Sequence, residues 1–157
     1  MMSFQRPYLF LIKITLFALI ISSVPTSQIL LEISPFWMLL FFIYWLIHFP
    51  AKGRFFLALV LGVLLDILHG DILGQNALAL ILSSAFIINV KQSFYVSNLS
   101  TQQVYVFSAA SIYLSLLLLV HTLTQGFNFS YYLLLAPLTS ALFWPVIKLA
   151  LSKCRHQ

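Results

Sequence analysis

Asp66 has the most unusual surroundings of any residue in this sequence. It lies in the apolar run LGVLLDILHGDILG (61–74) and is preceded by eleven residues without an ionisable side chain. A charged side chain in hydrocarbon costs about 2.5–3.5 kcal/mol on insertion scales, so such a residue faces protein or water rather than lipid. Gly62, Asp66, Gly70 and Gly74 follow one another at intervals of four residues. If one helix carries all four, they form a single face of small residues around one carboxylate.

The remaining side chains that could do chemistry are spread too widely to form a recognisable catalytic or metal site. Paired carboxylates for acid–base catalysis would require Asp66 and Asp71, which are five residues apart and point in different directions on a helix. The motifs GxxxxGK[ST], GxGxxG and HExxH are absent, and no nucleophile motif accompanies the serines. The four histidines lie far apart, mainly at predicted helix ends: His48, His69, His121 and His156. We therefore predict no catalytic residue, no metal site and no cofactor.

Three roles for Asp66 stay open at this point. It could form structural hydrogen bonds inside a helix bundle, contact a partner transmembrane helix, or form part of a proton or ion relay. His69, three residues later, and His121, near the same side of the membrane, are its candidate partners. A relay requires further ionisable groups along a path, and the sequence offers few. The glycine spacing allows close helix approach, either within one bundle or at a docking seam for another protein.

The composition places the chain in a membrane. Of its 157 residues 62% are hydrophobic and only 7% are charged, whereas a soluble domain has about 25% charged residues. The formal net charge of +5 comes from basic residues scattered singly or in pairs, which does not favour nucleic-acid binding. The single cysteine, Cys154, excludes an intrachain disulfide. The sequence predicts one polytopic all-α membrane domain over residues 1–157.

A transmembrane helix needs about 20 apolar residues. Six segments approach this length, and we predict spans at 8–24, 35–49, 55–70, 72–90, 104–123 and 131–151. With the N-terminus in the cytoplasm, all eight Lys and Arg residues fall on the cytoplasmic side and all three acidic residues on the other. Both termini are therefore predicted to be cytoplasmic.

Two segments of this scheme are irregular. The polar segment 91–103 is predicted to be an interfacial loop, with or without a short amphipathic helix. Pro137 and Pro145 interrupt the last span, and each removes a backbone hydrogen bond, so neighbouring helices or kinks must compensate.

The order of several motifs resembles a known family. PFWMLLFFIYW (35–45) is followed by a basic turn, then by GVLLDILHGDILG (62–74), and finally by LFWP (142–145) before a basic tail. This arrangement resembles the rod shape-determining MreD family of bacterial inner-membrane proteins over nearly the whole chain. The positions that match the family pattern are our candidates for packing or partner contact: Pro35, Trp37, Gly62, Asp66, Gly70, Gly74, Trp144 and Pro145.

The resemblance implies a non-enzymatic, multi-pass scaffold in the inner membrane that supports lateral peptidoglycan synthesis in the cell-elongation machinery. It implies direct contact with MreC. It also implies that MreB, and RodA with its penicillin-binding transpeptidase, belong to the same complex. It also implies a six-helix fold similar to the substrate-binding subunits of energy-coupling-factor transporters. The alternative is an uptake subunit for a vitamin-type small molecule. Such a subunit requires a pocket with several convergent polar groups.

Overall fold

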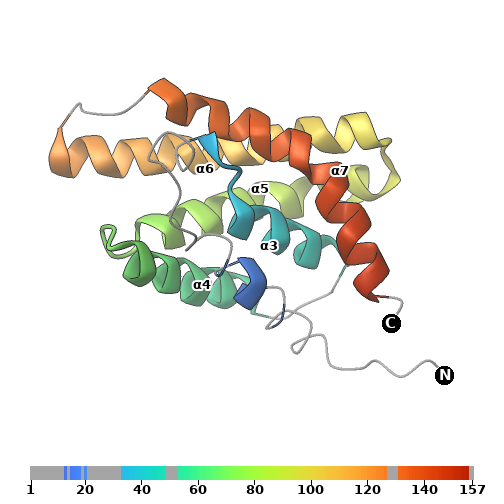
Figure 1. The fold of residues 1–157 in the computed structure, drawn as a ribbon, viewed down its shortest axis with the longest axis horizontal. Helices are drawn as coiled ribbons and strands as arrows, with labels where there is room; N and C mark the ends of the chain where they lie inside the picture. Colours follow the sequence, from blue (N-terminus) through green and yellow to red (C-terminus); the bar gives the residue numbers. More distant parts are fainter. Residues whose placement is uncertain are drawn as a thin grey trace.

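The computed structural model describes residues 13, 15–18, 20, 33–48, 53–126 and 131–155. Most of the predicted span 8–24 lies outside these residues. The described part is helical and contains no strand. Its elements, shown in Figure 1, are α3 (Trp37–His48), α4 (Arg54–His69), α5 (Gln75–Val96), α6 (Leu99–Gln125), the 3₁₀ helix η1 (Tyr131–Leu135) and α7 (Ala136–Arg155).

Three segments of the described part are long and apolar enough to cross a membrane. They are Gln75–Val96, Leu99–Gln125 and Tyr131–Ser152, each of which reaches the length of about 20 residues that a bilayer requires. The chain is thus an all-helical protein with the character of a membrane protein. Helices α4, α5, α6 and α7 each pack against the next one along the chain.

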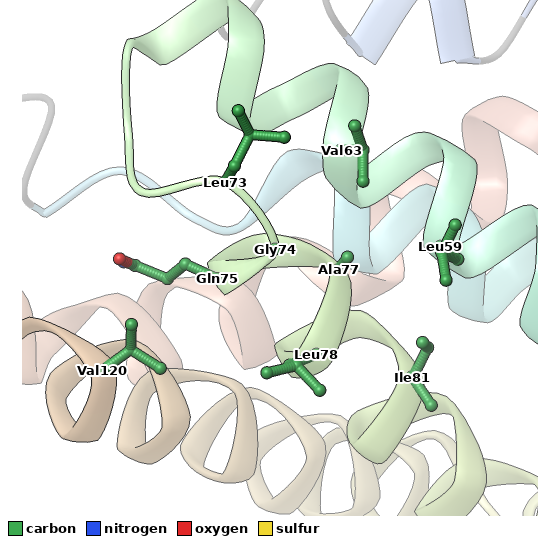
Figure 2. Close-up of a pocket in the computed structure, with 9 residues that line it drawn as sticks. All are labelled: Leu59, Val63, Leu73, Gly74, Gln75, Ala77, Leu78, Ile81 and Val120. Carbon is green, nitrogen blue, oxygen red and sulfur yellow. The ribbon is translucent and has the colours of Figure 1, made fainter.

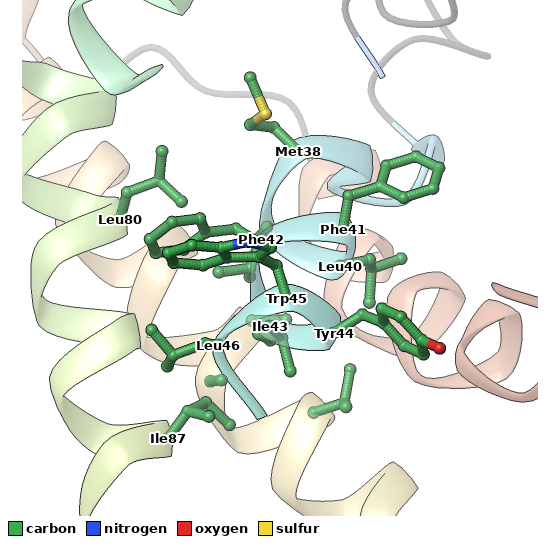
Figure 3. Close-up of a cluster of buried hydrophobic side chains, with 14 of the residues drawn as sticks. Met38, Leu40, Phe41, Phe42, Ile43, Tyr44, Trp45, Leu46, Leu80 and Ile87 are labelled. Carbon is green, nitrogen blue, oxygen red and sulfur yellow. The ribbon is translucent and has the colours of Figure 1, made fainter. Parts of the chain in front are cut away.

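The short helix α3 is the centre of the bundle. All ten residues from Met38 to Ile47 are buried, as expected for a helix that is apolar on every side. Figure 3 shows Phe42 and Trp45 directed toward Leu80 of α5, and the two rings stack with their centroids 5.9 Å apart. At about 1.5 Å per residue the twelve residues of α3 reach only about 18 Å. This helix is therefore a core element surrounded by longer helices.

The start of α3 is attached to α7. The backbone N–H of Phe36 donates to Ser140 Oγ at 3.0 Å, and Thr139 Oγ1 donates to the carbonyl of Ile33 at 2.8 Å. These bonds satisfy backbone groups before the first helical turn, where no intrahelical partner exists. They also join segments more than one hundred residues apart in the sequence.

The segment 91–103 is helical except at Ser97 and Asn98, so the ends of two long helices stand where an interfacial loop, with or without a short helix, was predicted. Helix α5 continues to Val96 and α6 begins at Leu99. Gln102 Nε2 donates to the carbonyls of Phe94 (3.2 Å) and Ser97 (3.1 Å). The last carbonyls of a helix have no intrahelical partner, and Gln102 supplies one for the end of α5. The polar composition of this segment therefore serves a tight helical hairpin.

Pro145 lies inside α7 without ending it. Proline has no N–H, so the carbonyl of Ala141, four residues earlier, loses its usual partner. Gln103 of α6 takes that place, since its Nε2 donates to the Ala141 carbonyl at 3.3 Å. Pro137 lies in the first turn of α7, where proline is tolerated. A neighbouring helix thus compensates for the interior proline.

At Gly62 the backbones of α4 and α5 approach each other closely. A Cβ atom built on Gly62 would lie 2.2 Å from the Cα atom of Ala77 and 2.4 Å from its backbone nitrogen. No side chain fits in that space, because the obstacle is backbone rather than a mobile side chain. Glycine at this position lets the two helix backbones touch.

We expect Gly62→Ala to separate α4 from α5 and to lower the free energy of unfolding by about 1–3 kcal/mol, as overpacking of a core does. The measurement is thermal unfolding of the purified protein in detergent. Val60→Ile is the matched control, because it adds one methyl group to an exposed position of the same helix. Equal unfolding temperatures for the two variants would contradict the close approach.

We expect Gln103→Leu to destabilise the protein by about 1–3 kcal/mol, because it leaves the Ala141 carbonyl unpaired. The cost should fall in a Pro145→Ala background, where the new N–H of residue 145 can bind that carbonyl. Gln92→Leu, at an exposed position, is the control. The measurement is a double-mutant cycle of unfolding temperatures, and additive effects would argue against the coupling.

Candidate functional site

Asp66 lies in the last turn of α4 and is buried, with 1% of its surface exposed. The helix ends at His69, so one helix does not carry all four residues of the glycine series. Gly70 and Gly74 lie in the turn between α4 and α5, with φ of +69° and +94°. Residues with a side chain rarely adopt these angles, whereas glycine does so readily. The series therefore combines a buried helix face (Gly62, Asp66) with a chain reversal.

The Asp66 carboxylate caps the next helix. Its Oδ2 accepts a hydrogen bond from the N–H of Gly74 at 2.7 Å, and its Oδ1 accepts from the N–H of Asn76 at 3.0 Å. The first N–H groups of a helix have no intrahelical partner, and a negative charge is favourable beside them. Gly74, the residue before α5, has no side chain to cap these groups. Asp66 supplies the cap from the preceding helix instead.

Two further side chains extend the network across three helices. Asn76 Nδ2 donates to Asp66 Oδ1 at 2.9 Å, and the hydroxyl of Tyr113 on α6 donates to Asn76 Oδ1. Both Asn76 and Tyr113 are buried. We call this group, Asp66, Gly74, Asn76 and Tyr113, the Asp66 corner. It joins the end of α4, the start of α5 and the middle of α6.

His69, one of the two predicted partners of Asp66, has its described hydrogen bond within its own helix. Its Nδ1 forms this bond with the carbonyl of Leu65, at 3.1 Å. His121 lies eight residues after Tyr113 on α6, and Tyr113 is the α6 residue that reaches the corner. Asn76 could have been found from the sequence, because it lies near the predicted start of a helix. An aspartate of the preceding segment can accept hydrogen bonds from the first N–H groups of such a helix. Tyr113 had no local signal.

The second group of predicted residues joins α7 to the α5–α6 hairpin. Trp144 is buried, and its Nε1 donates to Gln102 Oε1 at 3.3 Å. Lys148 Nζ donates to the same oxygen at 2.8 Å. The Trp144 ring also meets Phe94 edge-on, with centroids 5.5 Å apart. All four hydrogen bonds of the Gln102 amide therefore stay within the protein.

The remaining predicted residues mark the contact between α3 and α7. Pro35 is buried just before α3, and the Trp37 ring meets Phe143 of α7 edge-on at 5.4 Å. Pro145 follows Trp144 on α7. The structure thus brings Pro35 and Trp37 to the helix that carries Trp144 and Pro145, while Gly62, Asp66, Gly70 and Gly74 gather around the α4–α5 turn.

An apolar groove of about 260 Å³ lies beside the Asp66 corner, on the outer side of α4 and α5 (Figure 2). Gln75 is its one polar side chain, and Figure 2 shows its amide directed away from the other lining residues. The lining residues are Leu59, Val63, Leu73, Gly74, Gln75, Ala77, Leu78, Ile81 and Val120. This lining lacks the convergent polar groups that a vitamin-type ligand requires.

Within the described ranges, no three His, Cys, Asp or Glu side chains gather where they could hold a metal ion. The contacts of the Asp66 corner are those of a helix cap: a carboxylate that accepts from backbone and amide N–H groups. The chemistry that this geometry carries is hydrogen bonding between helices.

Comparison with known proteins identifies the family. The family model for the rod shape-determining protein MreD matches residues 2–154. The chain belongs to the MreD family. It is 29% identical over 127 residues to the rod shape-determining protein MreD of Haemophilus influenzae, across 80% of this chain and 77% of that protein. No solved structure matches the chain. The resemblance to the MreD family in the sequence is thereby confirmed, and membership supports a role in determining rod shape.

We expect Asp66→Asn to lower the free energy of unfolding by about 1–3 kcal/mol. An amide has one acceptor oxygen, so its NH₂ group must face either the N–H of Gly74 or the N–H groups of Asn76. Asp71→Asn is the matched control in the same turn: Asp71 is exposed and accepts only a long hydrogen bond, 3.4 Å, from Asn76 Nδ2, and asparagine keeps one acceptor oxygen for it. Denaturant or thermal unfolding in detergent measures both. A control as destabilised as Asp66→Asn would contradict the capping role.

Proposed function

We propose that the protein is a non-enzymatic scaffold of the machinery that elongates rod-shaped bacterial cells, and that it supports lateral peptidoglycan synthesis by contacting MreC. The observation that carries this proposal is the family match over residues 2–154. MreB and RodA with its penicillin-binding transpeptidase are proposed members of the same complex. No nucleic acid takes part, and the remaining surroundings of the chain are membrane lipid.

The structure supports a scaffold in two ways. The described residues form apolar helices with short connections, so little of the chain is free to form a separate soluble domain. The ionisable residue that stood out in the sequence, Asp66, uses its carboxylate to hold two helices together. We propose that Gly62, Asp66 and the two turn glycines keep α4 and α5 in the arrangement that partners recognise.

We propose a six-span topology in the inner membrane with both termini in the cytoplasm. The charges of the described helices support this orientation: Arg54 begins α4, whereas Asp66 lies in its last turn and Asp71 follows it. Cytoplasmic ends of membrane helices carry the excess of Lys and Arg. A fold similar to the substrate-binding subunits of energy-coupling-factor transporters stays a prediction.

The test is complementation in rod-shaped bacteria from which the gene for this chain has been removed. We expect rounded cells, restoration of rods by the wild-type chain, and co-purification of MreC with it. Asp66→Leu should fail to restore rods and should recover less MreC, because the α4–α5 arrangement is lost. Asp71→Asn should behave as wild type. Membrane levels of each variant are measured by immunoblot.

Cells that stay rod-shaped without the gene would contradict the role in shape. Full rescue by Asp66→Leu with unchanged MreC recovery would contradict the proposed contribution of the Asp66 corner. A stoichiometric vitamin-type ligand in the purified protein would favour the uptake alternative.

A further inference from the structure

The charged side chains of the described residues are separated along the bundle. The two described carboxylates, Asp66 and Asp71, lie at the end where α4 turns into α5. Arg54 begins α4, twelve residues before Asp66 and about 18 Å away along the helix axis. Lys91 lies near the end of α5 and bonds to the last turn of α3. Figure 1 shows that the end of α5, the end of α3 and the start of α4 all lie away from the turn between α4 and α5.

Lys91 is held in place by a neutral acceptor. Its side chain is partly buried, and Nζ donates to the carbonyl of Leu46 at 2.8 Å, in the last turn of α3. This bond satisfies a carbonyl that has no partner within its own helix. It does not neutralise the ammonium charge, which keeps two further N–H donors.

Arg54 lies close enough to Lys91 for the two positive charges to repel each other. Neither forms an ion pair with a carboxylate of the described residues, because both of those carboxylates lie at the other end of α4. Within the described residues, the fold therefore keeps these two cations near each other without a carboxylate between them. An anion at this position would remove the repulsion and bind both groups.

We propose that Arg54 and Lys91 bind the phosphate of an anionic phospholipid. Basic pockets between membrane helices on the cytoplasmic side are suited to phosphate headgroups. The residues beside Arg54 favour a lipid over free phosphate: Phe55 and Phe56 are 45% and 69% exposed on α4 and offer an apolar surface to the acyl chains. This proposal rests on the proposed location of the chain in a membrane. It does not rest on the proposed contact with MreC.

The test measures binding of phosphatidylglycerol to the purified full-length chain in detergent, by native mass spectrometry during a lipid titration. Phosphatidylcholine, which has the same phosphate but no net charge, is the reference lipid. We expect preferential binding of phosphatidylglycerol. Arg54→Gln and Lys91→Gln should each weaken it about fivefold, the effect of one basic residue near a charged membrane surface.

Lys148→Gln is the matched control. It removes the same charge as Lys91→Gln, but from a lysine on α7 whose Nζ is bound to Gln102, and it should leave the affinity unchanged. Arg54→Lys keeps the charge and should keep the binding. Arg54 forms no side-chain hydrogen bond with the described residues, so Arg54→Gln tests the site without removing a contact of the fold.

Equal binding of the two lipids, or wild-type affinity for phosphatidylglycerol in Arg54→Gln, would overturn the proposal. Inorganic phosphate is added as a competitor to distinguish a lipid headgroup from free phosphate as the bound anion. We expect no displacement at millimolar concentration. Displacement of phosphatidylglycerol by inorganic phosphate would assign the site to a free anion and overturn its assignment to a lipid.

Discussion

The bond on which the rest of the bundle depends is the one between the Asp66 carboxylate and the first N–H groups of α5. A backbone N–H group that is buried without a partner costs free energy comparable to a lost hydrogen bond. Asp66 satisfies those first N–H groups and sets the point at which α5 begins. Gly62, one turn earlier on α4, then lets the two backbones touch at Ala77. The Asp66 carboxylate and the close backbone contact at Gly62 thus both hold α4 against the start of α5.

The same constraint explains the two glutamines of α6. Gln102 binds carbonyls at the end of α5, and Gln103 binds the carbonyl that Pro145 leaves without a partner. Each of these side chains comes from a different helix than the backbone group that it satisfies. In a chain with so few polar residues, such bonds also determine which helices are neighbours. Gln102 and Gln103 therefore have a structural role.

This distribution of polar groups agrees with the family to which the chain belongs. A scaffold requires a stable arrangement of membrane helices, and Asp66, Asn76, Gln102 and Gln103 all form hydrogen bonds that hold neighbouring helices together. Many large apolar side chains are exposed on the bundle, and an apolar groove lies beside α4 and α5. Arg54 and Lys91, at the far end of α4 and α5, are the cations proposed above to bind a ligand from the membrane.

Composition and periodic hydrophobicity were sufficient to predict an all-helical membrane protein, and the ordered motifs were sufficient to predict its family. These properties depend on residues close together in the sequence. The helical character of 91–103 could not be predicted, because Gln102 stabilises the end of α5 only once α6 has folded back against it. Asp66 was predicted to face protein or water rather than lipid, but Asn76 and Tyr113 were not predicted to be in its network. Asn76 and Tyr113 lie ten and forty-seven residues away, and the packing of α4, α5 and α6 brings them together. Tertiary structure decided these contacts, because the sequence of one helix does not specify which face of another it will meet.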